Sequence, residues 1–167
     1  MDQCTRALVL FIYQNEYEMI YLNTPIAHLG REPSVRIANM ALRWCKNQFG
    51  INKRKKYLPA WYVRKGYTPD ICGEYDDSEN EVLIYWDQCK DVRELVQTCI
   101  HEWTHQLQPI TTKYYKYPGS YSRNPYERQA RYREKKYTPI FWEQYKNKIN
   151  DNKINRRTKA NTGPNRY

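Results

Sequence analysis

Long hydrophobic runs are missing from this chain of 167 residues. The longest apolar stretch, Ala7 to Tyr13, falls far short of the roughly 18 residues that a membrane-spanning helix needs. The start, Met1-Asp2, also lacks the basic segment that precedes the apolar part of a secretory leader. We therefore expect a cytoplasmic protein with no membrane span.

Paired cysteines are also missing. The five cysteines include no C-x-x-C pair and leave one over, which is typical of a reducing compartment rather than of a secreted disulfide framework. The spacing of Cys72 and Cys89 would still permit one bridge across a hairpin. The sequence leaves that alternative open.

Acidic residues are scarce only in the last third of the chain. Residues 1–112 carry 13 Lys and Arg against 14 Asp and Glu, whereas residues 113–167 carry 15 against 4. Residues 150–167 offer little to bury, so we expect one domain over 1–149 and a basic, disordered tail over 150–167. The charge indicates either a solvated tail or a surface for polyanions such as nucleic acid.

Apolar area comes mainly from aromatic side chains, with 17 Tyr and 5 Trp. These residues can form the core of one domain, the number that this length suggests. Apolar spacing of three and four predicts helices over 33–49 and from Pro139 to about Asn150, the second with its apolar face at Ile140, Phe141, Tyr145 and Ile149. Strands are predicted over 57–63, 71–75 and 81–86, the last two forming a hairpin; the type of element over 5–22 stays open.

A further helix is predicted to begin after Asp91, which can cap it together with Glu94. Its buried stripe consists of Val92, Leu95, Val96, Cys99, Ile100, Trp103 and Leu107. At about 100° per residue, His101 and His105 lie together on the opposite side of the helix. We therefore expect both imidazoles to lie outside the core.

The sequence HEWTH, residues 101–105, has the HExxH pattern. Its spacing places the rings of His101 and His105 one helical turn apart, close enough to bind one zinc ion. Glu102 then lies beside the metal, where it can act as general base on a zinc-activated water. The alternative is a surface pair of histidines beside a surface glutamate. The chain has only three histidines, and two of them lie in this pattern, which favours the zinc site.

A catalytic zinc needs three protein ligands, so one more must come from elsewhere. His28, in a loop-like stretch, is one candidate. Downstream, Asn124 and Pro125 are typical of a helix start, which places Glu127 at the third helical position. Glu127 can there serve as a capping-box partner or as a ligand.

A helix with HExxH, preceded by a strand and followed some twenty residues later by a helix carrying glutamate, resembles the gluzincin zinc metallopeptidases. This resemblance implies that Glu127 is the third ligand. The order of elements from residue 32 to about 136 resembles minigluzincin and SprT-like domains, including those of phages and other viruses. In gluzincins an Asp stands four residues after the ligand Glu, but position 131 is Arg131. SprT-like proteins usually have a third histidine, and none follows His105.

Peptide hydrolysis also needs a donor that stabilises the oxyanion. Tyr114, Tyr115, Tyr117 and Tyr121 lie between the ligand segments, and we expect Tyr121 to serve because it is nearest to Glu127.

The sequence therefore predicts an α+β, compact zincin-like domain with a small, mainly antiparallel sheet. The expected activity is that of a monomeric zinc-dependent endopeptidase whose protein or peptide substrate lies antiparallel to the strand beside the active helix. The alternative is a nucleic-acid-associated protein, either a tethered protease or an inactive zincin, that uses its basic C-terminal third. Richness in Asn, Lys, Tyr and Ile is typical of an AT-rich genome and favours a viral protein, found in the host cytoplasm or the virion.

Overall fold

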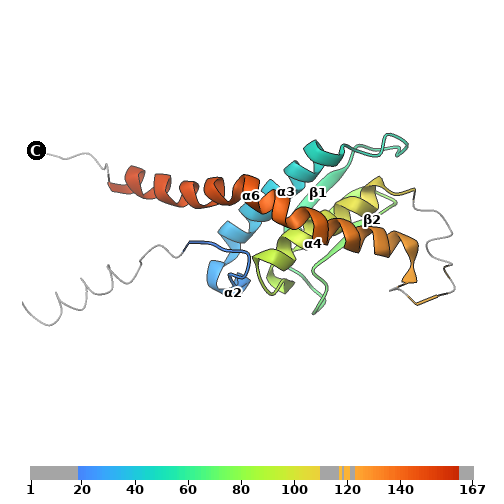
Figure 1. Ribbon diagram of the computed structural model, residues 1–167, viewed down its shortest axis with the longest axis horizontal. Coiled ribbons are helices and arrows are strands. Elements are labelled where there is room, and N and C mark those ends of the chain that lie inside the picture. The colour runs from blue at the N-terminus through green and yellow to red at the C-terminus, as the bar shows by residue number, and fades with distance from the viewer. Residues whose placement is uncertain (1–18, 110–116, 118, 121–122, 162–167) are drawn as a thin grey trace, which may run out of the picture.

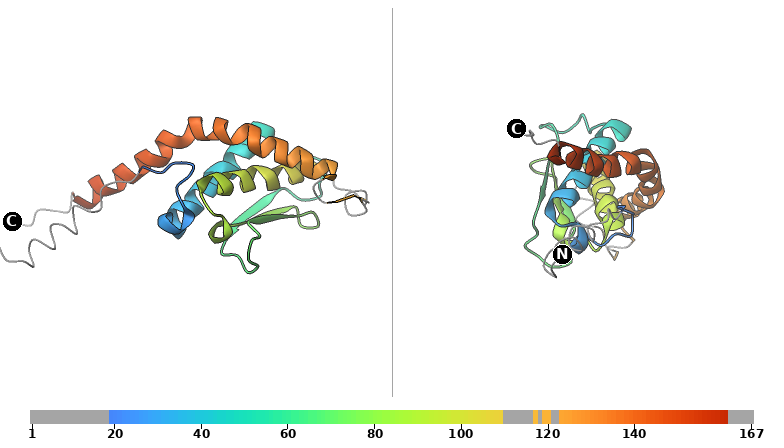
Figure 2. Two further views of the ribbon diagram at one scale, coloured as in Figure 1. Left: turned by 60° about the horizontal axis from the view of Figure 1, so that its bottom comes forward. Right: turned by 90° about the vertical axis from the view of Figure 1, so that its left-hand side faces the viewer.

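Three layers make up the protein in this computed structural model (Figures 1 and 2). The sheet forms one outer layer, helices α3 and α4 form the middle, and helix α6 lies on the other side. The structure describes residues 19–109, 117, 119–120 and 123–161, and only the backbone of 152–161. The predicted α+β class is confirmed.

Helix α3, Arg31–Phe49, confirms the helix expected over 33–49. It follows the short helix α2, Ile26–Leu29, and ends at Gly50, whose φ of 74° is the left-handed conformation that glycine adopts without strain. Its buried side chains are Ser34, Ile37, Ala38, Ala41, Leu42, Trp44 and Cys45.

The sheet has three strands in the order β1-β3-β2, with β1 at Ala60–Arg64, β2 at Gly73–Asp76 and β3 at Glu81–Tyr85. The β2–β3 hairpin is antiparallel, as predicted, but β1 pairs with β3 in parallel. The sheet is therefore mixed rather than mainly antiparallel. β3 lies between β1 and β2, and the order of neighbours cannot be deduced from strand patterns alone. Cys72 and Cys89 are free thiols, so no disulfide closes the hairpin.

Helix α4, Val92–Leu107, follows a short 3-10 turn, η1, at Trp86–Gln88. As predicted, Asp91 caps it: its Oδ1 accepts from the Glu94 N–H at 2.9 Å, and Glu94 Oε2 accepts from the Lys90 N–H at 2.6 Å. The predicted stripe is confirmed, since its members from Val92 to Trp103 are fully buried and Leu107 is half-buried.

Helix α6 runs without a break over Pro125–Asn161, so the prediction that a helix starts at Pro139 is wrong. Pro139 lies inside α6, where its missing N–H costs one helical hydrogen bond and favours a bend, and Figure 2 shows α6 bowed over α4. Phe141 and Ile149 are buried as expected, but Ile140 is exposed. The boundary drawn between residues 149 and 150 lies within α6, while residues 162–167 lie outside the described part.

α6 packs on the middle layer through aromatic side chains. Trp44 and Phe49 of α3 contact Tyr137 and Phe141 of α6, with ring centroids 4.9 to 6.3 Å apart. This packing holds the middle of α6 against α3. Among the described residues, none of the helices combines the length and the hydrophobicity needed to cross a membrane.

Candidate metal centre

Helix α4 is covered on two sides, because its apolar stripe faces α3 and the sheet and its histidine side faces α6 (Figure 2). His105 is only 5% exposed and the His101 side chain 14%. The expectation that both imidazoles lie outside the core is therefore wrong for His105. The helical period correctly separated the two faces, but it could not show that a second helix covers the histidines.

His101, His105 and Glu127 converge on one point between α4 and α6. Glu127 Oε2 lies 3.3 Å from His101 Nε2, and Glu127 Oε1 lies 3.3 Å from His105 Nε2. One ligand atom from each residue can be chosen so that all three lie within 4.8 Å of one another. Two imidazole nitrogens and a carboxylate oxygen are the donor set of many catalytic zinc sites.

Glu127 reaches this point from the first turn of α6. Asn124 Oδ1 accepts from the Tyr126 N–H at 3.0 Å, and Pro125 is the first helical residue, as the sequence predicted. The Glu127 side chain is fully buried, and its two oxygens face the two histidines. His28 lies in α2 and is not part of the cluster.

Gln108 fixes the ring of His105. Its Nε2 donates to the Tyr126 carbonyl at 2.9 Å and to Gln129 Oε1 at 2.7 Å, so its Oε1 is the acceptor that faces His105 Nδ1 at 2.8 Å. His105 must then donate through Nδ1–H, which leaves the Nε2 lone pair directed at the cluster.

Glu134 does the same for His101, since its Oε2 lies 2.7 Å from His101 Nδ1. Glu134 was not among the predicted residues, because the gluzincin resemblance implies an acidic partner at position 131, where Arg131 stands. A signal was available: Glu134 follows Glu127 by seven residues, two helical turns, and therefore lies on the same face of α6. A carboxylate behind a metal-binding histidine orients the ring and raises its basicity.

The protein's own charges stabilise the protonated form of His101. Burial lowers the pKa of His101, but hydrogen bonds to Glu127 and Glu134 outweigh that effect and raise it to about 10. At neutral pH this ring carries a proton that a metal ion must displace.

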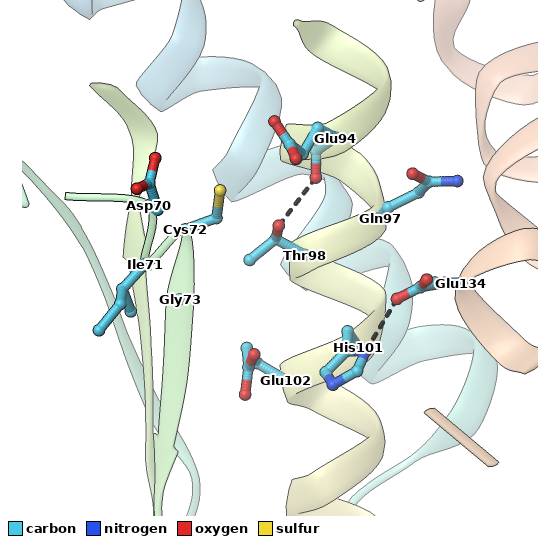
Figure 3. A pocket seen from close by; sticks show the side chains of 10 residues that line it. All are labelled: Asp70, Ile71, Cys72, Gly73, Glu94, Gln97, Thr98, His101, Glu102 and Glu134. Atoms are coloured by element: carbon cyan, nitrogen blue, oxygen red, sulfur yellow. Dashed lines mark hydrogen bonds and ion pairs between the residues drawn. The ribbon is translucent and has the colours of Figure 1, made fainter. Parts of the chain in front are cut away.

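Glu102 points away from His101, toward the strand that carries Gly73 (Figure 3). Its side chain is 9% exposed, and burial raises the pKa of its carboxyl. A Cβ atom on Gly73 of β2 would lie 3.1 Å from Glu102 Cγ and 2.6 Å from Thr98 Cγ2. Glycine at position 73 therefore allows β2 to approach the face of α4 that carries Glu102.

The tyrosines expected to stabilise an oxyanion lie mostly outside the described residues. This applies to Tyr114, Tyr115 and Tyr121, while Tyr117 is described and half-buried. The prediction for Tyr121 stays a prediction.

Comparison with known proteins adds no family to this geometry. Protein-family models, curated proteins and solved structures all give no match to this chain. What the site can do must be argued from its own residues.

Proposed function

We propose that the protein is a zinc-dependent endopeptidase in which His101, His105 and Glu127 hold the metal and Glu102 is the general base. One observation carries this proposal: three side chains from two helices, two of them buried and His101 half-buried, direct their donor atoms to one point, with all three within 4.8 Å of one another. Burying a carboxylate and two imidazoles is costly unless something pairs with them.

The donor set fits zinc better than magnesium or calcium, because two of the three donors are imidazole nitrogens. The two rings are held by Glu134 and Gln108 so that Nε2 of each faces the cluster. Among the described residues the cluster offers three ligands and no fourth. Three protein ligands are typical of a catalytic zinc, whereas a structural zinc has four.

When bound, zinc would supply Lewis acidity, which polarises a peptide carbonyl and makes water more acidic. Glu102 would accept a proton from the attacking water and pass it to the leaving amine. Burial raises the pKa of the Glu102 carboxyl, which makes it a stronger base than an exposed glutamate. β2 is an edge strand, so an extended substrate could pair with its outer edge beside Glu102.

The nucleic-acid alternative also has an observation in its favour. Exposed basic side chains lie along α6, among them Arg128, Lys135, Lys136 and Lys148. In that alternative the basic surface binds a polyanion such as nucleic acid. The protein is then either a protease tethered to the nucleic acid or a zincin without hydrolytic activity.

The test separates metal binding from catalysis with two isosteric changes. Glu127→Gln removes the anionic ligand, and we expect zinc affinity to fall sharply. Glu102→Gln should keep the zinc content and the fold but lose at least about a hundredfold in hydrolysis of a casein-like chain. Glu143→Gln, at an exposed position of α6, is the matched control and should change neither property.

Zinc content is measured by elemental analysis and activity by release of peptide fragments. Parental cleavage by the Glu102→Gln variant would show that the hydrolytic mechanism is wrong. A fully zinc-loaded wild-type protein that cleaves no polypeptide would favour the nucleic-acid alternative.

A further inference from the structure

A cavity of about 340 Å³ adjoins the metal cluster (Figure 3). It lies between the side of α4 that carries His101 and Glu102 and the segment from Asp70 to Gly73 that leads into β2. Because the side chain of Glu102, the proposed base, lines this cavity, we expect the substrate segment next to the reacting bond to bind there.

The charge of this cavity is opposite to that of the whole chain. Ten residues line it, and they include four carboxylates, no Lys or Arg, and one cationic group, the protonated His101 ring that is paired with Glu134. The carboxylates belong to Asp70, Glu94, Glu102 and Glu134. The chain as a whole carries a net charge of +10. A negative cavity in a positive protein favours a cationic group over a neutral or acidic one.

Glu102 provides a second sign of a ligand. It is 9% exposed, its carboxylate faces the cavity, and no described residue donates a hydrogen bond to it. A carboxylate buried to this degree requires a polar partner, and the cavity is where that partner can enter.

A second metal ion does not account for the carboxylates. Among the described residues the only group with donor atoms close enough for a metal is His101, His105 and Glu127. The acidic groups of the cavity are spread along its wall instead. Such an arrangement suits the extended side chain of a lysine or arginine.

The positions of the carboxylates along the cavity set the distance between the bound cationic side chain and the reacting bond. Glu94 lies seven residues before His101 on α4, which corresponds to about 10 Å along the helix axis. An extended peptide covers that distance with about three residues. Asp70 and Glu94 therefore face a side chain two or three residues away from the bond that Glu102 serves. Glu134 is held by His101, and Glu94 Oε2 accepts from the Lys90 N–H, whereas Asp70 is exposed at the cavity mouth.

From these observations we infer that the substrate is a basic peptide segment, with a lysine or arginine two or three residues from the scissile bond seated between Asp70 and Glu94. The inference rests on the proposed peptidase function and names its substrate class. It is also independent of the basic surface of α6, which would attract the opposite charge.

The test uses three peptides that share one scissile bond and differ at one position, with lysine, norleucine or glutamate there. We expect kcat/KM of the zinc-loaded protein to be about tenfold higher for lysine than for norleucine, and lowest for glutamate. Asp70→Asn should reduce the ratio of kcat/KM for the lysine peptide to kcat/KM for the norleucine peptide. Glu79→Gln, an exposed change in the β2–β3 turn, is the control and should leave the preference intact.

A binding measurement decides the point independently of turnover. The zinc-loaded Glu102→Gln protein should bind the lysine peptide more tightly than the norleucine peptide by calorimetry, and added salt should reduce that difference. Equal kcat/KM for all three peptides, or equal binding of lysine and norleucine, would overturn the basic-substrate inference while the peptidase proposal stands. Absence of hydrolysis with a preserved binding preference would overturn the peptidase proposal instead.

Discussion

Glu134 and Gln108 bind the Nδ1 side of the two imidazoles in the proposed metal centre. Each accepts from the Nδ1–H of one histidine, at 2.7 Å for His101 and 2.8 Å for His105. The anionic partner stabilises positive charge on its ring, whereas the amide only orients its ring. The two histidines should therefore contribute unequally to metal affinity and to its pH dependence.

The first prediction concerns Glu134→Gln, which keeps the size of the side chain but removes its charge. We expect zinc affinity to fall by about ten- to a hundredfold, because His101 becomes a less basic ligand and its ring is held less firmly. Competition with a chelator measures the affinity, and circular dichroism checks the fold. Glu143→Gln on the same helix should bind zinc as the parent does. An unchanged affinity in Glu134→Gln would show that the hydrogen bond does not support the metal.

The second prediction follows from the pKa of about 10 for His101 in the metal-free protein. Because a metal ligand must be neutral, zinc binding at pH 7 should release the His101 proton, and zinc affinity should rise about tenfold per pH unit between pH 6 and 8. Calorimetry in two buffers with different ionisation enthalpies counts the released protons. In Glu134→Gln the pKa of His101 should fall, so fewer protons should be released. Zero protons released by the parent protein at pH 7 would contradict the prediction.

At the scale of elements, α4 carries the two histidines of the proposed metal site and the proposed base on different faces. His101 and His105 face α6, which supplies Glu127 and Glu134, while Glu102 faces β2 across Gly73 (Figure 3). The geometry of the proposed metal site therefore depends on how α6 packs on α4. The position of Glu102, the proposed base, depends on how β2 packs on α4.

The third prediction tests this separation with Gly73→Ala. The added methyl group would meet Thr98 Cγ2 at 2.6 Å, the Leu83 carbonyl oxygen at 2.9 Å and Glu102 Cγ at 3.1 Å, so the strand or the base must shift. We expect zinc affinity to stay close to that of the parent while kcat falls by at least about tenfold, since small displacements of a base are costly. Loss of zinc together with activity would mean that the substitution disturbs the whole domain rather than the base.

At the scale of the whole molecule, the excess of basic over acidic residues lies mainly in α6 and in the residues after it. Residues 152–167 contain five Lys and Arg and no Asp or Glu. A shortened chain should end at Asp151 rather than at Ile149, because the Asn150 side chain accepts from the Ile20 N–H at 2.9 Å and donates to the Ile20 carbonyl at 3.3 Å. That contact joins the two ends of the described domain.

The fourth prediction addresses the nucleic-acid alternative with this shortened chain. If the tail binds DNA or RNA, the slope of log affinity against log salt should decrease by up to about 4 when five cationic residues are removed. Cleavage of a short neutral peptide should survive the deletion, because every metal ligand and the base precede residue 128. Equal and negligible DNA binding by both chains would leave the charge without a role in nucleic-acid binding.

Local patterns were enough to predict most of the elements and two of the three residues of the cluster, His101 and His105. The helical period separated the buried stripe of α4 from His101 and His105, and capping residues located the starts of α4 and α6. These properties depend on residues within a few positions of one another, so the sequence alone determines them. The role of Glu127 as third ligand was implied by resemblance, and the structure places its carboxylate between the two histidines.

Only the tertiary structure decided what depends on residues far apart. It placed β3 between β1 and β2, continued α6 past Pro139 without a break, and buried His105. It also paired His101 with Glu134 across 33 positions. Packing between elements decides such features, because burying aromatic area between α3 and α6 outweighs the local preference of one proline to end a helix. The elements were therefore determined locally, whereas the centre and its acidic cavity exist only where α4, α6 and β2 meet.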